Sequence, residues 1–179
     1  MIKDDLKKIL VTEEQIAQRC KELGEQLDHD YADRHDVLFV GILKGSIPFM
    51  AELIKHIDLD IQFDFMDVTS YSGTESTGEI RILKDLETPI KGRHILIVED
   101  IIDTGKTLKT VCEILMTRGA AGIKIVTLLN KPSRRESDIE GDYVGFDVPN
   151  EFVIGFGLDF NQKYRCLPYV GVLKEECYK

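Results

Sequence analysis

The sequence predicts an α/β domain in which a mainly parallel sheet is flanked by helices. Apolar runs typical of strands alternate with amphipathic helical segments along all 179 residues. Apolar residues make up 43% and charged residues 31% of the chain, a composition typical of a soluble globular domain. Because no repeat and no linker-like stretch divides the sequence, we expect a single folded unit.

The first half of the chain predicts one β-α-β unit. A helix is expected after Thr12, since Thr12 and the glutamine three residues later have the spacing of a capping box. The apolar run 36–43 predicts a buried strand, and Pro48 favours the start of a second helix. Alternating apolar residues over 61–68 then predict a second strand.

The second half predicts another such unit after a long loop. Turn-forming residues dominate 70–85, which we expect to be a mobile loop. A β-branched run at 94–98, a helix that ends at Gly119 and a strand at 123–129 follow. Ligands of parallel sheets bind at the carboxyl ends of the strands. Short strands near 143–146, 152–154 and 169–173 are expected to form a small cap or an edge addition.

Charge and composition exclude several classes of function. The net charge is −9, with 32 acidic against 23 basic residues, which opposes non-specific binding to nucleic acid or an anionic membrane. The four cysteines form no CxxC pair and the four histidines have no metal-ligand spacing, so we expect reduced thiols and no zinc site. No apolar run reaches the ~20 residues of a membrane span, and the first residues are too charged for a signal peptide. We expect a cytoplasmic protein.

One segment combines two opposite polarities. The strand at 95–98 runs into three acids, Glu99, Asp100 and Asp103. Residues 103–107 then place a glycine and two hydroxyls at the start of a helix, where free N–H groups and the helix dipole attract a phosphate. Carboxylates suit sugar hydroxyls, magnesium or a developing cation. The carboxylates and the N–H groups together predict that the ligand is a phosphorylated sugar that becomes positively charged during the reaction.

Two other interpretations of this segment stay open. Gly105-Lys106-Thr107 has the ending of the GxxxxGK[ST] motif of nucleoside triphosphatases, but the first glycine of that motif is replaced by Asp100. The acids could also be ordinary loop and helix-cap residues, although a cap accounts for one carboxylate rather than three. The charge run 134–138, further along the chain, is typical of a solvated turn.

The run 97–108 resembles the phosphoribosyl pyrophosphate signature of type I phosphoribosyltransferases, in the form carried by hypoxanthine-guanine phosphoribosyltransferases. The resemblance covers nearly the whole chain. It implies the type I phosphoribosyltransferase fold, with a core at about 36–131 and a small hood formed by the N-terminal and C-terminal segments. The other segments that carry the resemblance are 43–46, 70–73, 131–132, 152–153, 158–159 and Arg165.

The resemblance implies a role for each residue of the phosphate and ribose sites. Glu99 and Asp100 would lie beneath the ribose, and Asp103 would be the acid-base group that faces purine N7. Lys44, Gly45 and Arg165 would bind pyrophosphate, whereas the residues alone favour an ordinary solvated turn at Lys44-Gly45 over an anion site. In relatives this turn contains a non-proline cis peptide. The residues that would hold the 5'-phosphate are Asp103, Thr104, Gly105, Lys106 and Thr107.

The resemblance likewise implies a purine site. Lys131 would donate to the 6-oxo group, Phe152 would stack on the base, and the Val153 backbone would meet its Watson-Crick edge. Asp159 would lie at this site too. Without the resemblance, Lys131 would be interpreted as solvated, Phe152 as core, and Asp159 and Arg165 as surface residues. Glu99, Asp100 and Asp159 would ligate Mg2+, and a loop that begins at Ser70 and Tyr71 would close over the site.

The implied activity is transfer of 5-phosphoribosyl from phosphoribosyl pyrophosphate to N9 of hypoxanthine, and also of guanine. The partners would then be phosphoribosyl pyrophosphate and 6-oxopurine bases, with no nucleic acid and no membrane, in a homodimer or homotetramer. The alternative is a regulator of the same fold that senses phosphoribosyl pyrophosphate and binds RNA or a partner protein. The net charge of −9 disfavours that alternative.

Overall fold

A six-stranded sheet forms the centre of the computed structural model, which describes residues 2–70 and 80–179. The strand order is β4-β3-β2-β5-β6-β7, and only the β3–β4 pair is antiparallel. The fold class predicted from the sequence is therefore confirmed. The strands are β2 (Val37–Leu43), β3 (Gln62–Ser70), β4 (Ile80–Lys84), β5 (His94–Ile102), β6 (Gly122–Asn130) and β7 (Tyr143–Asp147).

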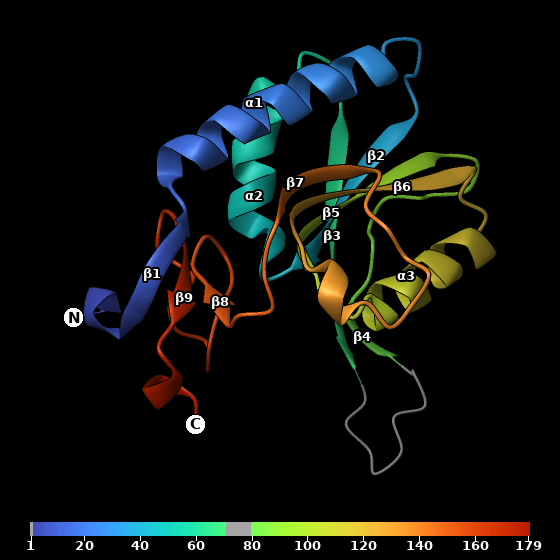
Figure 1. The fold of residues 1–179 in the computed structure, drawn as a ribbon. Helices are drawn as coiled ribbons and strands as arrows, with labels where there is room; N and C mark the ends of the chain where they lie inside the picture. Colours follow the sequence, from blue (N-terminus) through green and yellow to red (C-terminus); the bar gives the residue numbers. More distant parts are fainter. Residues whose placement is uncertain (1, 71–79) are drawn as a thin grey trace.

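Helices cover both faces of this sheet (Figure 1). Successive residues of a strand point to opposite faces, so Leu96 and Val98 of β5 join the hydrophobic core beneath α1 (Glu13–Asp30) and α2 (Ser46–Leu53). Ile95 and Ile97 join the core beneath α3 (Lys106–Thr117). Short 3-10 turns are found at Ile2–Asp5, Ile54–His56, Pro132–Arg134 and Glu175–Cys177. Among the described residues, no helix is both long and apolar enough to cross a bilayer.

The start of α1 is fixed by the predicted capping box. Thr12 Oγ1 accepts a hydrogen bond from the Gln15 backbone N–H at 3.2 Å, and Gln15 Oε1 accepts one from the Thr12 N–H at 2.9 Å. Two donors that the helix cannot pair internally are thus satisfied. This element could be predicted because the interaction is local in sequence.

A second, three-stranded sheet joins the two ends of the chain. It has the order β1-β9-β8, with β1 (Leu6–Val11), β9 (Val170–Leu173) and β8 (Val153–Ile154) all antiparallel. Figure 1 shows this sheet beside the carboxyl end of the central strands, with both termini near it. It packs around a small core of its own. We refer to this sheet and the segments attached to it as the hood.

Two expectations for the strands were wrong. β5 continues past Val98 to Ile102, so Glu99 and Asp100 lie within the strand rather than after it. β4 occupies 80–84, where a loop was expected, because Ile80 and Ile82 pack against the α3-side core. β7 pairs parallel to β6 at the edge of the central sheet, which is the edge addition expected as one of two alternatives for 143–146.

Of the two residues predicted to begin the mobile loop, only Ser70 lies within the described residues. Ser70 is the last residue of β3 and pairs with Ile80. Tyr71 lies outside the described residues.

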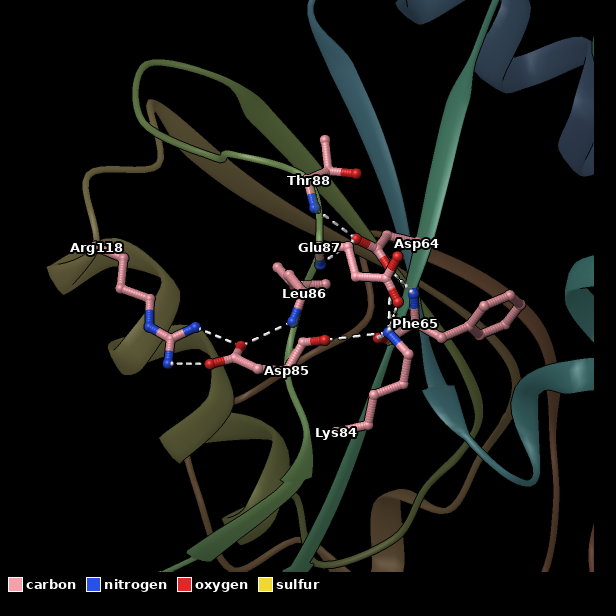
Figure 2. A network of polar contacts seen from close by, with 8 residues as sticks. All are labelled: Asp64, Phe65, Lys84, Asp85, Leu86, Glu87, Thr88 and Arg118. Atoms are coloured by element: carbon pink, nitrogen blue, oxygen red, sulfur yellow. Dashed lines mark hydrogen bonds and ion pairs between the residues drawn. The ribbon is translucent and has the colours of Figure 1, made fainter.

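A polar network anchors the stem of the β3–β4 hairpin (Figure 2). Asp64, only 8% exposed, accepts hydrogen bonds from the backbone N–H groups of Phe65, Glu87 and Thr88 at 2.7–2.9 Å. Lys84 Nζ lies 3.4 Å from the same carboxylate. Burial alone would raise the pKa of Asp64, but the hydrogen bonds outweigh burial and hold the pKa below its ordinary value.

Replacing Asp64 by Asn is expected to lower the free energy of unfolding near pH 7 by about 1–3 kcal/mol, because buried donors lose a charged acceptor. A depressed folded-state pKa means that the carboxylate stabilises the fold above its ordinary pKa of 3.8, and that this contribution is lost as the pH falls through the folded-state value. Urea unfolding at about pH 7 and at a pH well below 3.8 measures both effects. The difference from wild type should shrink at the lower pH, and Asp60→Asn, at an exposed site, should change little at either.

Candidate active site

Two adjoining cavities open at the carboxyl ends of β5 and β6, and both are lined by Ile101 and Asp103. The hood cavity, of about 400 Å³, lies between the central sheet and the hood. The loop cavity, of about 180 Å³, lies at the start of α3. Predicted site residues line the hood cavity at Asp103, Lys131, Phe152, Val153 and Asp159. They line the loop cavity at Glu99, Asp103, Thr104, Gly105 and Thr107.

The loop cavity has the features of an anion cradle. Gly105 adopts a left-handed backbone conformation with φ 78°, which lets the chain turn sharply into α3. Glycine has no side chain to cap the helix, so N–H groups of its first turn are open to an outside acceptor. The Lys106 ammonium group instead pairs with Glu136 Oε2 at 2.5 Å. Lys106 itself does not line the loop cavity, and its backbone N–H donates to Thr104 Oγ1 at 3.5 Å.

Glu99 and Asp100 form a tightly coupled pair of acids in β5. Burial, and next the neighbouring Asp100 charge, raise the pKa of Glu99 well above its ordinary value. Burial also raises the pKa of Asp100, against the hydrogen bond that its Oδ1 accepts from the Ile101 N–H at 2.8 Å. Glu99 Oε2 is inaccessible to solvent and has no hydrogen-bond partner among the described residues. Such an orphaned carboxylate oxygen suits a hard divalent cation.

Two of the predicted pyrophosphate residues, Gly45 and Arg165, lie near Asp100, and none of the three lines either cavity. The Leu43–Lys44 peptide is cis, so the non-proline cis bond precedes Lys44. A Cβ atom on Gly45 would overlap Asp100 Oδ2, which shows how closely the turn approaches the acid pair. Gly157, with φ 99°, packs against the Gly45 carbonyl, and Arg165 Nη1 donates to the Gly157 carbonyl at 2.6 Å.

The hood cavity brings a buried cation close to Asp103. Lys131 is 6% exposed, its Nζ donates to the Glu151 carbonyl at 3.0 Å, and burial lowers its pKa. The Asp103 carboxylate, 41% exposed, lies 3.1 Å from Arg134 Nε. A neutral hydrogen-bond acceptor in this cavity would thus meet a poorly hydrated ammonium group on one side and a carboxylate on another.

Phe152 contributes an aromatic wall that is 36% exposed. Its ring is stacked on Tyr178, with centroids 4.9 Å apart and planes at 25°, and meets the edge of Phe160 at 5.5 Å. These contacts fix the orientation of the Phe152 ring. A flat aromatic ligand could stack only on the face of the Phe152 ring that Tyr178 does not cover.

Asp159 is tied to Arg165. Its Oδ1 lies 2.8 Å from Arg165 Nη2, and its Oδ2 accepts the Gln162 N–H at 2.8 Å. Asp159 does not complete a metal site with Glu99 and Asp100, because the described residues contain no group of three acids, histidines or cysteines with metal-binding geometry. A cation here would need substrate oxygens in addition to protein ligands.

Several residues of these cavities were not predicted from the sequence. Ile101 lines both of them, and Glu151, Arg134 and Tyr178 line the hood cavity. The pair Arg134-Arg135, a few residues after Lys131 at the end of β6, was a signal that could have been used. No sequence signal pointed to Tyr178, because its contact with Phe152 joins residues that are far apart in the sequence.

Comparison with known proteins agrees with this geometry. A family model described as a phosphoribosyl transferase domain matches residues 8–161, which include every predicted site residue except Arg165. The chain belongs to the phosphoribosyltransferase family. The recognition made from the 97–108 signature is therefore confirmed.

Curated phosphoribosyltransferases and solved structures resemble the chain over its whole length. It is 57% identical over 179 residues to a hypoxanthine-guanine phosphoribosyltransferase of Streptococcus thermophilus, with 99% of each chain covered. It is 54% identical to that of Bacillus subtilis, covering 100% of this chain and 99% of the other. A crystal structure of a hypoxanthine phosphoribosyltransferase from Staphylococcus aureus superimposes with a TM-score of 0.95 at 54% identity, covering 99% of this chain and 97% of that one.

Proposed function

We propose that this phosphoribosyltransferase carries out purine salvage, transferring 5-phosphoribosyl from phosphoribosyl pyrophosphate to N9 of hypoxanthine and of guanine. The products are IMP or GMP and pyrophosphate. The observation that carries the proposal is that one acid, Asp103, lines both cavities. A base in the hood cavity and a ribose 5-phosphate in the loop cavity would therefore meet beside it. The names of the similar proteins, which include hypoxanthine and guanine, support this choice of bases.

The residues of the hood cavity would bind and orient the base. Phe152 stacks on the purine, the Val153 backbone meets its Watson-Crick edge, and Lys131 donates to its 6-oxo group. Asp103 manages the proton at N7 as N9 attacks the anomeric carbon. Because Lys131 is buried and cannot accept a hydrogen bond, it would leave the amino group of adenine unpaired.

The loop cavity and the acid pair would hold the sugar. The backbone N–H groups of 103–107 bind the 5'-phosphate, and the carboxylates beneath the ribose stabilise the positive charge that develops as the pyrophosphate departs. Lys44, Gly45 and Arg165 receive the pyrophosphate. Glu99, Asp100 and Asp159 are the residues that would hold Mg2+, and the unpartnered Glu99 Oε2 fits that role. When bound, Mg2+ offsets the charge of the pyrophosphate group.

We further propose that the chain acts in the cytoplasm as a homodimer or homotetramer of one phosphoribosyltransferase domain each, with a core at about 36–131. Its partners are phosphoribosyl pyrophosphate and 6-oxopurines. An overall charge of −9 makes nucleic acid a poor partner, while local N–H groups and Mg2+ supply the positive field that the anionic substrate needs.

A panel of purines incubated with phosphoribosyl pyrophosphate and Mg2+ tests the proposed activity by the appearance of nucleoside monophosphates. Hypoxanthine and guanine should be converted and adenine should be a poor substrate. Binding of phosphoribosyl pyrophosphate together with salt-dependent RNA retention, but without turnover of any purine, would instead favour a regulator.

Replacing Lys131 by Met should reduce the preference for hypoxanthine over adenine, measured as the ratio of their kcat/KM values, by about 10²-fold. The reason is that the 6-oxo group loses its donor while the amino group of adenine no longer faces an ammonium group. Lys21→Met, on the exposed surface of α1, is the matched control and should leave the ratio unchanged. An unaltered ratio in the Lys131 variant would exclude Lys131 as the residue that reads the base.

A further inference from the structure

The segment 134–137, interpreted from its sequence as a solvated turn, lies against the phosphate-binding loop 103–107. The Glu136 N–H donates to the Thr104 carbonyl at 3.0 Å, and Ser137 Oγ donates to the same carbonyl at 3.2 Å. A Cβ atom on Gly105 would overlap Ser137 Oγ. The two segments are thus in direct contact, and we call 134–137 the clasp.

Arg135 is the most deeply placed side chain of the clasp. Its side chain is 9% exposed. Nη1 donates to the Asp103 carbonyl, and Nη2 donates to Asn130 Oδ1 at the end of β6. Asn130 Nδ2 in turn donates to Asp147 Oδ1 in β7 at 2.7 Å. One planar guanidinium group therefore ties the first residue of the phosphate loop to the edge of the central sheet.

These contacts decide which backbone groups of the loop are available to an anion. A carbonyl oxygen that faced a phosphate would repel it, whereas an N–H group attracts it. The carbonyl groups of Asp103 and Thr104 are both engaged by donors of the clasp. Glu140 Oε1 lies 3.6 Å from Arg135 Nε and offsets part of the guanidinium charge, so the effect of Arg135 on the loop rests on its two hydrogen bonds rather than on its field.

We propose that Arg135 is a positioning residue for the 5'-phosphate: it holds the Asp103 carbonyl on the far side of the loop and so keeps the N–H groups of 103–107 directed at the phosphate. It acts through the loop and does not touch the substrate. This inference rests on the proposed function, because it assigns the 5'-phosphate of that substrate to the loop cavity.

Binding of inosine and of IMP, which differ only in the 5'-phosphate, tests the inference by calorimetry on Arg135→Met and Arg135→Lys. Arg135→Met should weaken IMP by about 10-fold or more and raise the KM for phosphoribosyl pyrophosphate in parallel. The affinity for inosine, and kcat at saturating substrate, should change by less than about 3-fold. Arg135→Lys should not restore IMP affinity, because an ammonium group cannot bridge two separate acceptors with the same geometry.

Two further variants keep the test decisive. Ser137→Ala, which removes one hydrogen bond to the Thr104 carbonyl, should weaken IMP by a few-fold and spare inosine, even if Arg135→Met folds poorly. Arg118→Met, which breaks an exposed ion pair with Asp85, should affect neither ligand. Equal weakening of IMP and inosine, or unchanged IMP affinity, would overturn the role of Arg135 alone. A wild-type protein that bound IMP no better than inosine would overturn the proposed function as well.

Discussion

Replacing Asp103 by Asn is expected to lower kcat for transfer to hypoxanthine by about 10²- to 10⁴-fold, the range typical of a general acid-base group. Asp103 lines both cavities, and its carboxylate remains 41% exposed although it pairs with Arg134. A carboxylate at that place can accept a proton from the purine, and an amide of nearly the same shape cannot. The loss should therefore appear in the chemical step rather than in binding.

Steady-state kinetics with calorimetry of IMP separates these two effects. The Asp103→Asn variant should keep an IMP affinity within about 3-fold of wild type while kcat falls. Asp33→Asn is the matched control for the loss of one carboxylate, because Asp33 is exposed and lines neither cavity. If kcat of the Asp103 variant stayed within about 2-fold of wild type, proton transfer at this residue would be ruled out.

The sequence predicted the parts of the fold that depend on local patterns. The capping box at Thr12, the buried run of β2 and the glycine turn into α3 each rest on residues within a few positions of one another. The acids and the glycine of 99–107 could be placed in one site for the same reason. The local pattern also gave a wrong strand end: the apolar run predicted that β5 ends at Val98, but the strand continues through Glu99 and Asp100 to Ile102.

The parts that could not be predicted depend on contacts between distant residues. The pairing of β1 with β9 joins opposite ends of the chain, and β7 enters the central sheet parallel to β6 without an α-helix between them. Neither follows from periodicity. The clasp is a similar case, because nothing in a run of mixed charges shows that Arg135 is buried against the carbonyl of Asp103.

Replacing Gly45 by Ala is expected to reduce turnover by about 10²-fold or more, although the backbone at this position accepts any residue. Gly45 has φ −62° and ψ −33°, so the change causes no conformational strain. The new methyl group would overlap Asp100 Oδ2, and the buried carboxylate would have to move away from the ribose site. A displacement of about 1 Å in a reacting geometry is enough for such a loss. Kinetics with saturating hypoxanthine and phosphoribosyl pyrophosphate measures it.

A double-mutant cycle shows whether the overlap with Asp100 is the cause. Gly45→Ala alone should lower the free energy of unfolding by about 1–3 kcal/mol, as overpacking does. In an Asp100→Ala background the carboxylate is absent, so the same change should cost less, with a coupling of at least about 0.5 kcal/mol. Gly122→Ala, whose Cβ would meet His94 at an ordinary 3.4 Å, controls for the added methyl group. Additive effects of the two substitutions would mean that Gly45→Ala does not act through Asp100. The close packing of the turn against the acid pair would then not explain the loss of turnover.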